Sequence, residues 1–372
     1  MVAGNNVAPI RARGLGVPFA GETGLHNAIT DVGNVAVGYS TIFRGDGPLR
    51  VGLGPVRTGV TAIMPRGHAG VAQPVFAATH TLNGNGELTG SLWVEESGQL
   101  EGPITLTNTH SCGVARDATV RWLVERHGAL TDVWSLSVAG ETYDGELNDI
   151  NGFHVTADHV FEAIDTAAPG ALALGSVGGG TGMICYDFKG GCGSSSRQFE
   201  IDGQKFTLGV FVQANFGIRA ELMIAGVPVG EHITGGEVRS KPTGSIIAIV
   251  ATDVPLLPHQ LKRLARRVSL GMARTGSVSH NGSGDIFLAF TTAQNVTSGS
   301  RKSIYRAEFI DNSDLNPVFT AVVQATEEAI IDSMVVNATM TGRDGITVHA
   351  LPHDKLCETL RTYNRLGNID SP

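Results

Sequence analysis

The clearest hydrophobic pattern along the chain lies in its C-terminal third. Residues 246–251 form an unbroken apolar run of strand length, Ile-Ile-Ala-Ile-Val-Ala, which predicts a β-strand covered on both faces. Over 257–272 apolar side chains recur every three or four residues, which predicts an amphipathic helix with its basic side chains in solvent. A second buried strand is predicted over 286–291, and Asn316-Pro317 opens a long helix. This order of elements predicts an α/β fold in which helices cover a sheet.

The first half of the chain alternates short apolar segments with glycines. Strands are predicted over 34–39, 59–64 and 71–76, where glycines interrupt the apolar runs. Helices are predicted over 111–126 and 158–166. Because no internal repeat and no convincing linker divides the sequence, the whole chain is predicted to form one α/β unit.

Composition and charge narrow the class of protein. Hydrophobic residues make up 42% of the 372 residues and charged residues 17%, so a sizeable core can form. There are 27 basic and 35 acidic side chains, a net charge of −8, and no long basic run, which argues against nucleic acid as a partner. The N-terminal residues lack the apolar region of a signal peptide, and no apolar run has the length of a membrane helix. The sequence therefore predicts a soluble cytoplasmic protein with no membrane partner.

The sequence contains none of the common metal or cofactor motifs. The cysteines Cys112, Cys185, Cys192 and Cys357 have no zinc-site spacing and are expected to be reduced and mostly buried. The HExxH pattern, the GxSxG nucleophile elbow and the phosphate-binding loop are absent as well. We therefore expect neither a metal nor a cofactor.

One short segment suggests a specific chemistry. Gly244 and Ser245 directly precede the predicted strand over 246–251. If the bond between them is cut, Ser245 gains a free α-amine, whose ordinary pKa of about 7.7–8.0 lets it act as a base for the hydroxyl of the same residue. Such a serine needs no histidine, as in enzymes with N-terminal nucleophiles. Gly244 suits a cleavage site because glycine accepts unusual backbone angles. On these residues alone, an ordinary turn before a strand is the other interpretation.

Five segments, taken together and in order, resemble the DmpA/β-aminopeptidase family of L-aminopeptidases, D-amidases and D-esterases. The resemblance spans essentially the whole chain, and the combination is specific although each segment alone is not. The segments are 23–33, 140–152, 212–217, the 244–245 junction and 281–285.

The resemblance implies a four-layer αββα sandwich, with two stacked sheets between helix layers as in N-terminal-nucleophile hydrolases. It implies a single domain over residues 1–372 that cuts itself into an α chain, 1–244, and a β chain, 245–372. It also implies a serine aminopeptidase that releases N-terminal amino acids from small peptides, amides or esters through an acyl-enzyme on Ser245. Relatives of this kind assemble as tetramers of α/β heterodimers.

The resemblance further assigns catalytic roles to individual residues. Ser245 would be the nucleophile, and Asn215 would donate its amide to the oxyanion with support from Tyr143. Ser283 and Asp285 would orient the hydroxyl and the amine of Ser245. Asp285 is shorter than the Glu that some relatives carry at this position, which leaves its contact open.

Two further residues are expected to bind substrate. Glu141 would receive the free ammonium, and Trp134 would line the pocket. Glu141 lies two residues before Tyr143, so on an extended segment both side chains point to the same face. Each candidate position also fits an ordinary structural role, as a turn, core or surface residue.

Two other functions fit the same sequence. An acyltransferase of the ornithine-acetyltransferase type shares the layered fold, but normally uses Thr where this chain has Ser245. A non-catalytic protein would keep its chain uncut and would run as one band on a denaturing gel. The preference among L-α-, β- and D-amino acids is left open by the sequence.

Overall fold

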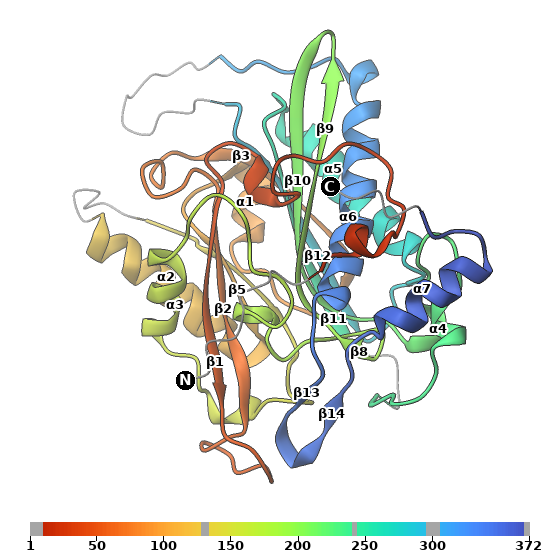
Figure 1. Cartoon of the computed structure of the whole chain (residues 1–372). Helices are drawn as coiled ribbons and strands as arrows, with labels where there is room; N and C mark the ends of the chain where they lie inside the picture. The colour runs from red at the N-terminus through yellow and green to blue at the C-terminus, as the bar shows by residue number, and fades with distance from the viewer. Residues whose placement is uncertain (1–9, 128–133, 240–243, 295–305, 368–372) are drawn as a thin grey trace.

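Two stacked β-sheets lie between two layers of helices in a computed structural model of the chain (Figure 1). The structure describes residues 10–127, 134–239, 244–294 and 306–367. One pair of helices covers the smaller sheet and another pair covers the larger sheet. The αββα sandwich implied by the family resemblance is thereby confirmed.

The larger sheet contains both central strands that the sequence predicts. In spatial order it runs β4 (Gln99–Leu100), β3 (Val75–Gly84), β12 (Ser283–Thr291), β11 (Gly244–Thr252), β10 (Gln204–Asn215) and β9 (Gly191–Ile201). β11 and β12 are parallel, whereas β11 and β10 are antiparallel. The strand predicted over 71–76 is wrong in its first residues. β3 begins only at Val75, directly after Pro74, which has no N–H to donate to a sheet.

The smaller sheet supplies the other wall of the molecule's interior. It runs β1 (Ala36–Arg44), β2 (Val56–Met64), β5 (Ile104–Asn108) and β6 (Val138–Thr142), with β5 and β6 parallel. β1 and β2 confirm the strands predicted over 34–39 and 59–64, and both extend beyond the predicted ranges.

All four helices predicted from spacing are present. α2 (Cys112–Arg126) and α3 (Ala157–Asp165) lie on the smaller sheet, and α5 (Pro258–Arg274) and α6 (Asn316–Val335) lie on the larger one. No helix among the described residues is both long and apolar enough to cross a membrane. Other elements are α1 (Ser91–Ser97), α4 (Val229–His232), α7 (His353–Thr362) and the short strands β7 (Ile184–Cys185), β8 (Phe188–Lys189), β13 (Met340–Thr341) and β14 (Thr347–Val348).

β11 is apolar because both of its faces are covered. Ile246 and Val250 pack with the inner side chains of α5 and α6, whereas Ile247 and Ile249 pack in the cluster between the two sheets. Each fully buried Ile contributes about 1.5–3 kcal/mol through the hydrophobic effect. Side chains alternate along a strand, so Ser245 shares the face of Ile247, which is turned toward the smaller sheet. The fold thus places the candidate nucleophile between the two sheets.

Candidate active site

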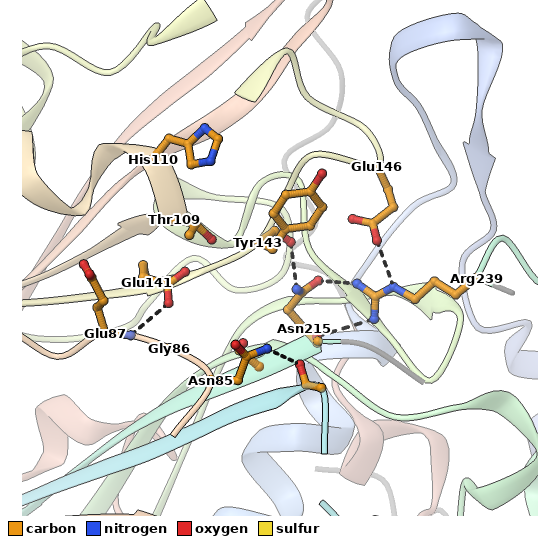
Figure 2. Close-up of a pocket in the computed structure, with 13 residues that line it drawn as sticks. Asn85, Gly86, Glu87, Thr109, His110, Glu141, Tyr143, Glu146, Asn215 and Arg239 are labelled. Carbon is orange, nitrogen blue, oxygen red and sulfur yellow. Dashed lines mark hydrogen bonds and ion pairs between the residues drawn. The ribbon is translucent and has the colours of Figure 1, made fainter. Parts of the chain in front are cut away.

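An open cavity of about 650 Å³ lies where β10 ends and β11 begins, opposite the end of β6 (Figure 2). Its lining brings together five of the residues predicted from the sequence: Glu141, Tyr143, Asn215, Gly244 and Ser245. The lining also includes Asn85, Glu87, Thr109, His110, Glu146 and Arg239. Residues far apart in the sequence therefore meet in one cavity between the sheets.

Ser245 is the second residue of β11 and is almost completely buried. Its Oγ accepts a hydrogen bond from the Gly284 N–H at 3.2 Å, across the parallel pairing of β11 with β12. This bond leaves the hydroxyl hydrogen available to a base.

Gly244 cannot be replaced without moving the backbone around it. Its φ is +141°, in the region that side chains other than glycine rarely adopt. A Cβ atom at this position would lie 2.0 Å from the Asn215 carbonyl oxygen and 2.8 Å from the Phe216 Cα. The glycine before Ser245 is therefore required by the close approach of β10, whatever its part in cleavage.

Asn215 ends β10 and is directly paired with Ser245, so both side chains lie on the same face of the sheet. Its Oδ1 accepts hydrogen bonds from the Ile184 N–H at 2.9 Å and from Arg239 Nη2 at 2.8 Å. Its Nδ2 donates to the Tyr143 carbonyl oxygen at 2.7 Å. These partners define which end of the amide is nitrogen, and an amide nitrogen carries a second hydrogen that an oxyanion could accept.

Tyr143 lies just beyond β6, with its half-exposed ring on the cavity wall. Burial, reinforced by the nearby Glu146 carboxylate, raises the pKa of the Tyr143 phenol. The phenol therefore stays protonated at neutral pH and can donate a hydrogen bond to a developing negative charge.

Glu141, in β6, is a carboxylate with only 2% of its surface exposed. One of its oxygens accepts the Glu87 N–H at 3.0 Å. Burial raises the pKa of Glu141, although the Thr109 hydroxyl and the Glu87 N–H favour its charged form. A buried carboxylate of this kind is stabilised by a cationic partner, so an ammonium group in the cavity would be bound favourably.

Ser283 and Asp285 sit in β12 beside Ser245, but they face away from its hydroxyl. Asp285 accepts hydrogen bonds from the Ser283 hydroxyl at 2.6 Å, from the Ser279 hydroxyl and from the Ile246 N–H. Its position in the strand alternation puts it on the face opposite Ile286, toward the helices. The orienting contact expected with the Ser245 hydroxyl is therefore made in this structure by the Gly284 N–H instead.

Trp134 does not belong to the cavity lining. Its side chain is 62% exposed and packs edge to face against Trp93, with ring centroids 5.3 Å apart. The expectation that Trp134 lines the pocket is therefore not met within this chain.

Three charged residues of the cavity, Glu87, Glu146 and Arg239, were missed by the sequence analysis. Arg239 and Glu146 form an ion pair, Nε to Oε1, at 3.4 Å beside Asn215. The available signals were the place of Glu146 within the resemblance segment 140–152 and the position of Arg239 six residues before Ser245. Among the described residues, no group of three or more His, Cys, Asp or Glu is arranged to hold a metal ion.

Comparisons with known proteins identify the family and the fold of the chain. A family model described as peptidase family S58 matches residues 27–348. The chain is 51% identical to the β-peptidyl aminopeptidase BapA of Sphingosinicella microcystinivorans, over 96% of this chain and 93% of the relative.

Two solved structures share the fold over nearly their whole length. The L-aminopeptidase D-Ala-esterase/amidase of Ochrobactrum anthropi, described as a prototype of the serine aminopeptidases with a variant Ntn-hydrolase fold, superposes with a TM-score of 0.92 at 47% identity. The match covers 96% of this chain and 99% of that one. A β-aminopeptidase from Burkholderia sp. superposes with a TM-score of 0.87 at 43% identity, covering 95% and 99%.

Proposed function

The chain belongs to peptidase family S58 and is a serine-type aminopeptidase, and from this premise we propose that it matures by cutting its own Gly244–Ser245 bond. The cut would separate residues 1–244 from residues 245–372, whose first residue is the nucleophile. Family membership favours this hydrolase over an acyltransferase of the same layered fold. One observation supports the proposal most: Ser245, at the start of a central strand, lies in the same cavity as Asn215 and Glu141.

In self-cleavage, the Ser245 hydroxyl attacks the carbonyl carbon of Gly244. The Asn215 amide stabilises the tetrahedral oxyanion, and the C–N bond breaks as the nitrogen takes up the proton that the hydroxyl has lost. The product is an ester between Gly244 and Ser245 Oγ. Water hydrolyses that ester to a Gly244 carboxylate and a Ser245 with a free amine.

In turnover, the freed α-amine accepts the proton of the Ser245 hydroxyl as the oxygen attacks the substrate carbonyl carbon. Asn215 and Tyr143 stabilise the oxyanion until the leaving amine takes up the proton and departs. A water molecule, activated by the same α-amine, then hydrolyses the acyl-enzyme. Asp285 is proposed to orient the freed amine, since its carboxylate already binds the N–H of Ile246, the next residue along β11.

The proposed substrates are peptides, amides and esters with a free N-terminal amine, which Glu141 would bind as an ammonium. The relatives support this class, because they are named as a β-peptidyl aminopeptidase and as an L-aminopeptidase that is also a D-Ala-esterase/amidase. A panel of aminoacyl p-nitroanilides in L-α, β and D forms would rank the three series for this chain.

Replacement of the nucleophile tests the proposal. Wild-type protein is expected to give two fragments on a denaturing gel, and the smaller should begin Ser-Ile-Ile-Ala. Ser245→Ala is expected to remain one full-length chain without peptidase activity, because alanine has no hydroxyl to attack either carbonyl. An intact-mass measurement showing uncut wild-type protein with full activity would refute the mechanism.

We also propose assembly into a tetramer of α/β heterodimers. The paired rings of Trp93 and Trp134 and the neighbouring Leu92 form an exposed apolar surface. Such surfaces are typical of protein interfaces, so we propose that a second copy of the chain packs against this surface in the tetramer.

A further inference from the structure

We propose that Arg239 is a positioning residue, which holds the Asn215 amide in the orientation that receives the oxyanion. The inference rests on the function proposed above and adds a residue to its machinery. It applies to self-cleavage and to substrate turnover alike, since both pass through an oxyanion at the same amide.

The guanidinium of Arg239 donates two hydrogen bonds to Asn215. Nη2 donates to the side-chain Oδ1 at 2.8 Å, and Nη1 donates to the backbone carbonyl oxygen of the same residue at 3.4 Å. Nη1 also donates to the Ile184 carbonyl oxygen at 3.2 Å. The Arg239 side chain is only 3% exposed, so these contacts are made with the charge largely out of water.

The same guanidinium connects Asn215 to the segment that carries Tyr143. Its Nε lies 3.4 Å from Glu146 Oε1, three residues beyond Tyr143 (Figure 2). Arg239 therefore contacts both the end of β10 and the segment that follows β6. These two segments supply the proposed oxyanion-binding groups.

The orientation matters because the two ends of a primary amide have nearly the same shape and opposite polarity. If Asn215 turned its amide over, its carbonyl oxygen would face the oxyanion and repel it. A cationic donor on Oδ1 opposes that rotation more strongly than a neutral one, since hydrogen bonds to charged groups are about twice as strong. It also polarises the amide, which makes the N–H at the other end a better donor.

A double-mutant cycle on the full-length enzyme tests the inference. Arg239→Met is expected to lower kcat about 10- to 100-fold with little change in KM, somewhat less than loss of an oxyanion donor itself. In an Asn215→Ala background, the same substitution is expected to cost less than about threefold, because the group that Arg239 positions is already gone. Arg239→Lys keeps the charge but not the fork of donors, and should give an intermediate kcat.

Arg343 provides a matched control. It binds the same segment, through the Gly145 carbonyl oxygen at 2.6 Å, and pairs with Asp344, but among the described residues it makes no hydrogen bond or ion pair with Asn215. Arg343→Met removes a cation from the same segment without removing a donor to Asn215, so it should change kcat less than about threefold.

The outcomes are distinguishable. Equal losses from Arg239→Met in both backgrounds, an unchanged kcat, or an equal loss from Arg343→Met would overturn the role of Arg239. If Arg239→Met does not fold, as judged by its melting transition, the cycle is run with Arg239→Lys. Where a variant matures too slowly for its kcat to be measured, the same cycle is run on the rate of self-cleavage, followed on a gel. A wild type that neither cleaves itself nor hydrolyses aminoacyl p-nitroanilides would refute the proposed function instead.

Discussion

Glu141→Gln is the most direct test of how the enzyme recognises a free amine. The carboxylate is almost completely buried, and one of its oxygens accepts the Glu87 N–H. Glutamine has nearly the same shape, and its carbonyl oxygen can still accept that hydrogen bond. The substitution therefore removes the negative charge and little else.

The expected magnitude follows from the burial of Glu141. A surface ion pair would contribute only about 0–1 kcal/mol, but Glu141 is 2% exposed, so solvent screens its charge poorly. Loss of one partner from a buried, hydrogen-bonded charge pair costs about 2–5 kcal/mol. Because 1.4 kcal/mol corresponds to about tenfold, kcat/KM for a free-amine substrate should fall about 30- to 4,000-fold.

The stability of the variant should not fall with its activity. Burial raises the pKa of Glu141, which means that the fold favours the protonated carboxyl. The stabilising contribution of a group with a raised pKa is present below its unfolded value and is lost as pH rises through its folded value. Glutamine mimics the protonated form, so at neutral pH the melting temperature should equal or exceed that of wild type.

The assay measures kcat/KM for an aminoacyl p-nitroanilide, with self-cleavage followed on a gel. Self-cleavage should be normal, because the Gly244–Ser245 bond lies within a chain and presents no free ammonium. Glu87→Gln is the matched control: Glu87 is an exposed carboxylate on the same cavity, and its loss should change kcat/KM less than about threefold. If Glu141→Gln matures normally and hydrolyses the free-amine substrate as well as wild type does, Glu141 is not the anchor.

Two further substitutions test the oxyanion site and the buried interior. Asn215→Ala should lower kcat about 10²–10³-fold with a much smaller change in KM and should slow self-cleavage, as measured by steady-state kinetics and gel; an unchanged kcat would exclude Asn215 from the site. Asp144 is completely buried, and burial raises its pKa to about 7. Its contribution to the free energy of unfolding is therefore complete below the ordinary carboxyl pKa and is lost as the pH rises through about 7. Asp144→Asn cannot titrate and should flatten that decline in urea unfolding between about pH 4 and 8, whereas an identical pH profile would contradict the shift.

The sequence by itself determined the elements whose pattern is local. The apolar run of β11 and the spacing of α5 and α6 are readable because burial imposes a period on each segment independently of its neighbours. The position of Ser245 was readable for the same reason, since it directly precedes such a run. The prediction of a strand over 71–76 was wrong in its first residues. Hydrophobicity alone would allow a strand there, but Pro74 has no N–H for the hydrogen bonds between strands.

Only the tertiary structure decided which residues meet at the site. The register of β10 against β11 puts Asn215 opposite Ser245, and the stacking of the smaller sheet over the larger one buries Glu141 beside them. The strand alternation of β12 turns Asp285 to the far face, and no local pattern marked Arg239. Register, face and layer are relations between segments distant along the chain. The spacing of apolar residues along a segment indicates which side chains are buried, but not which side chains of other segments they pack against.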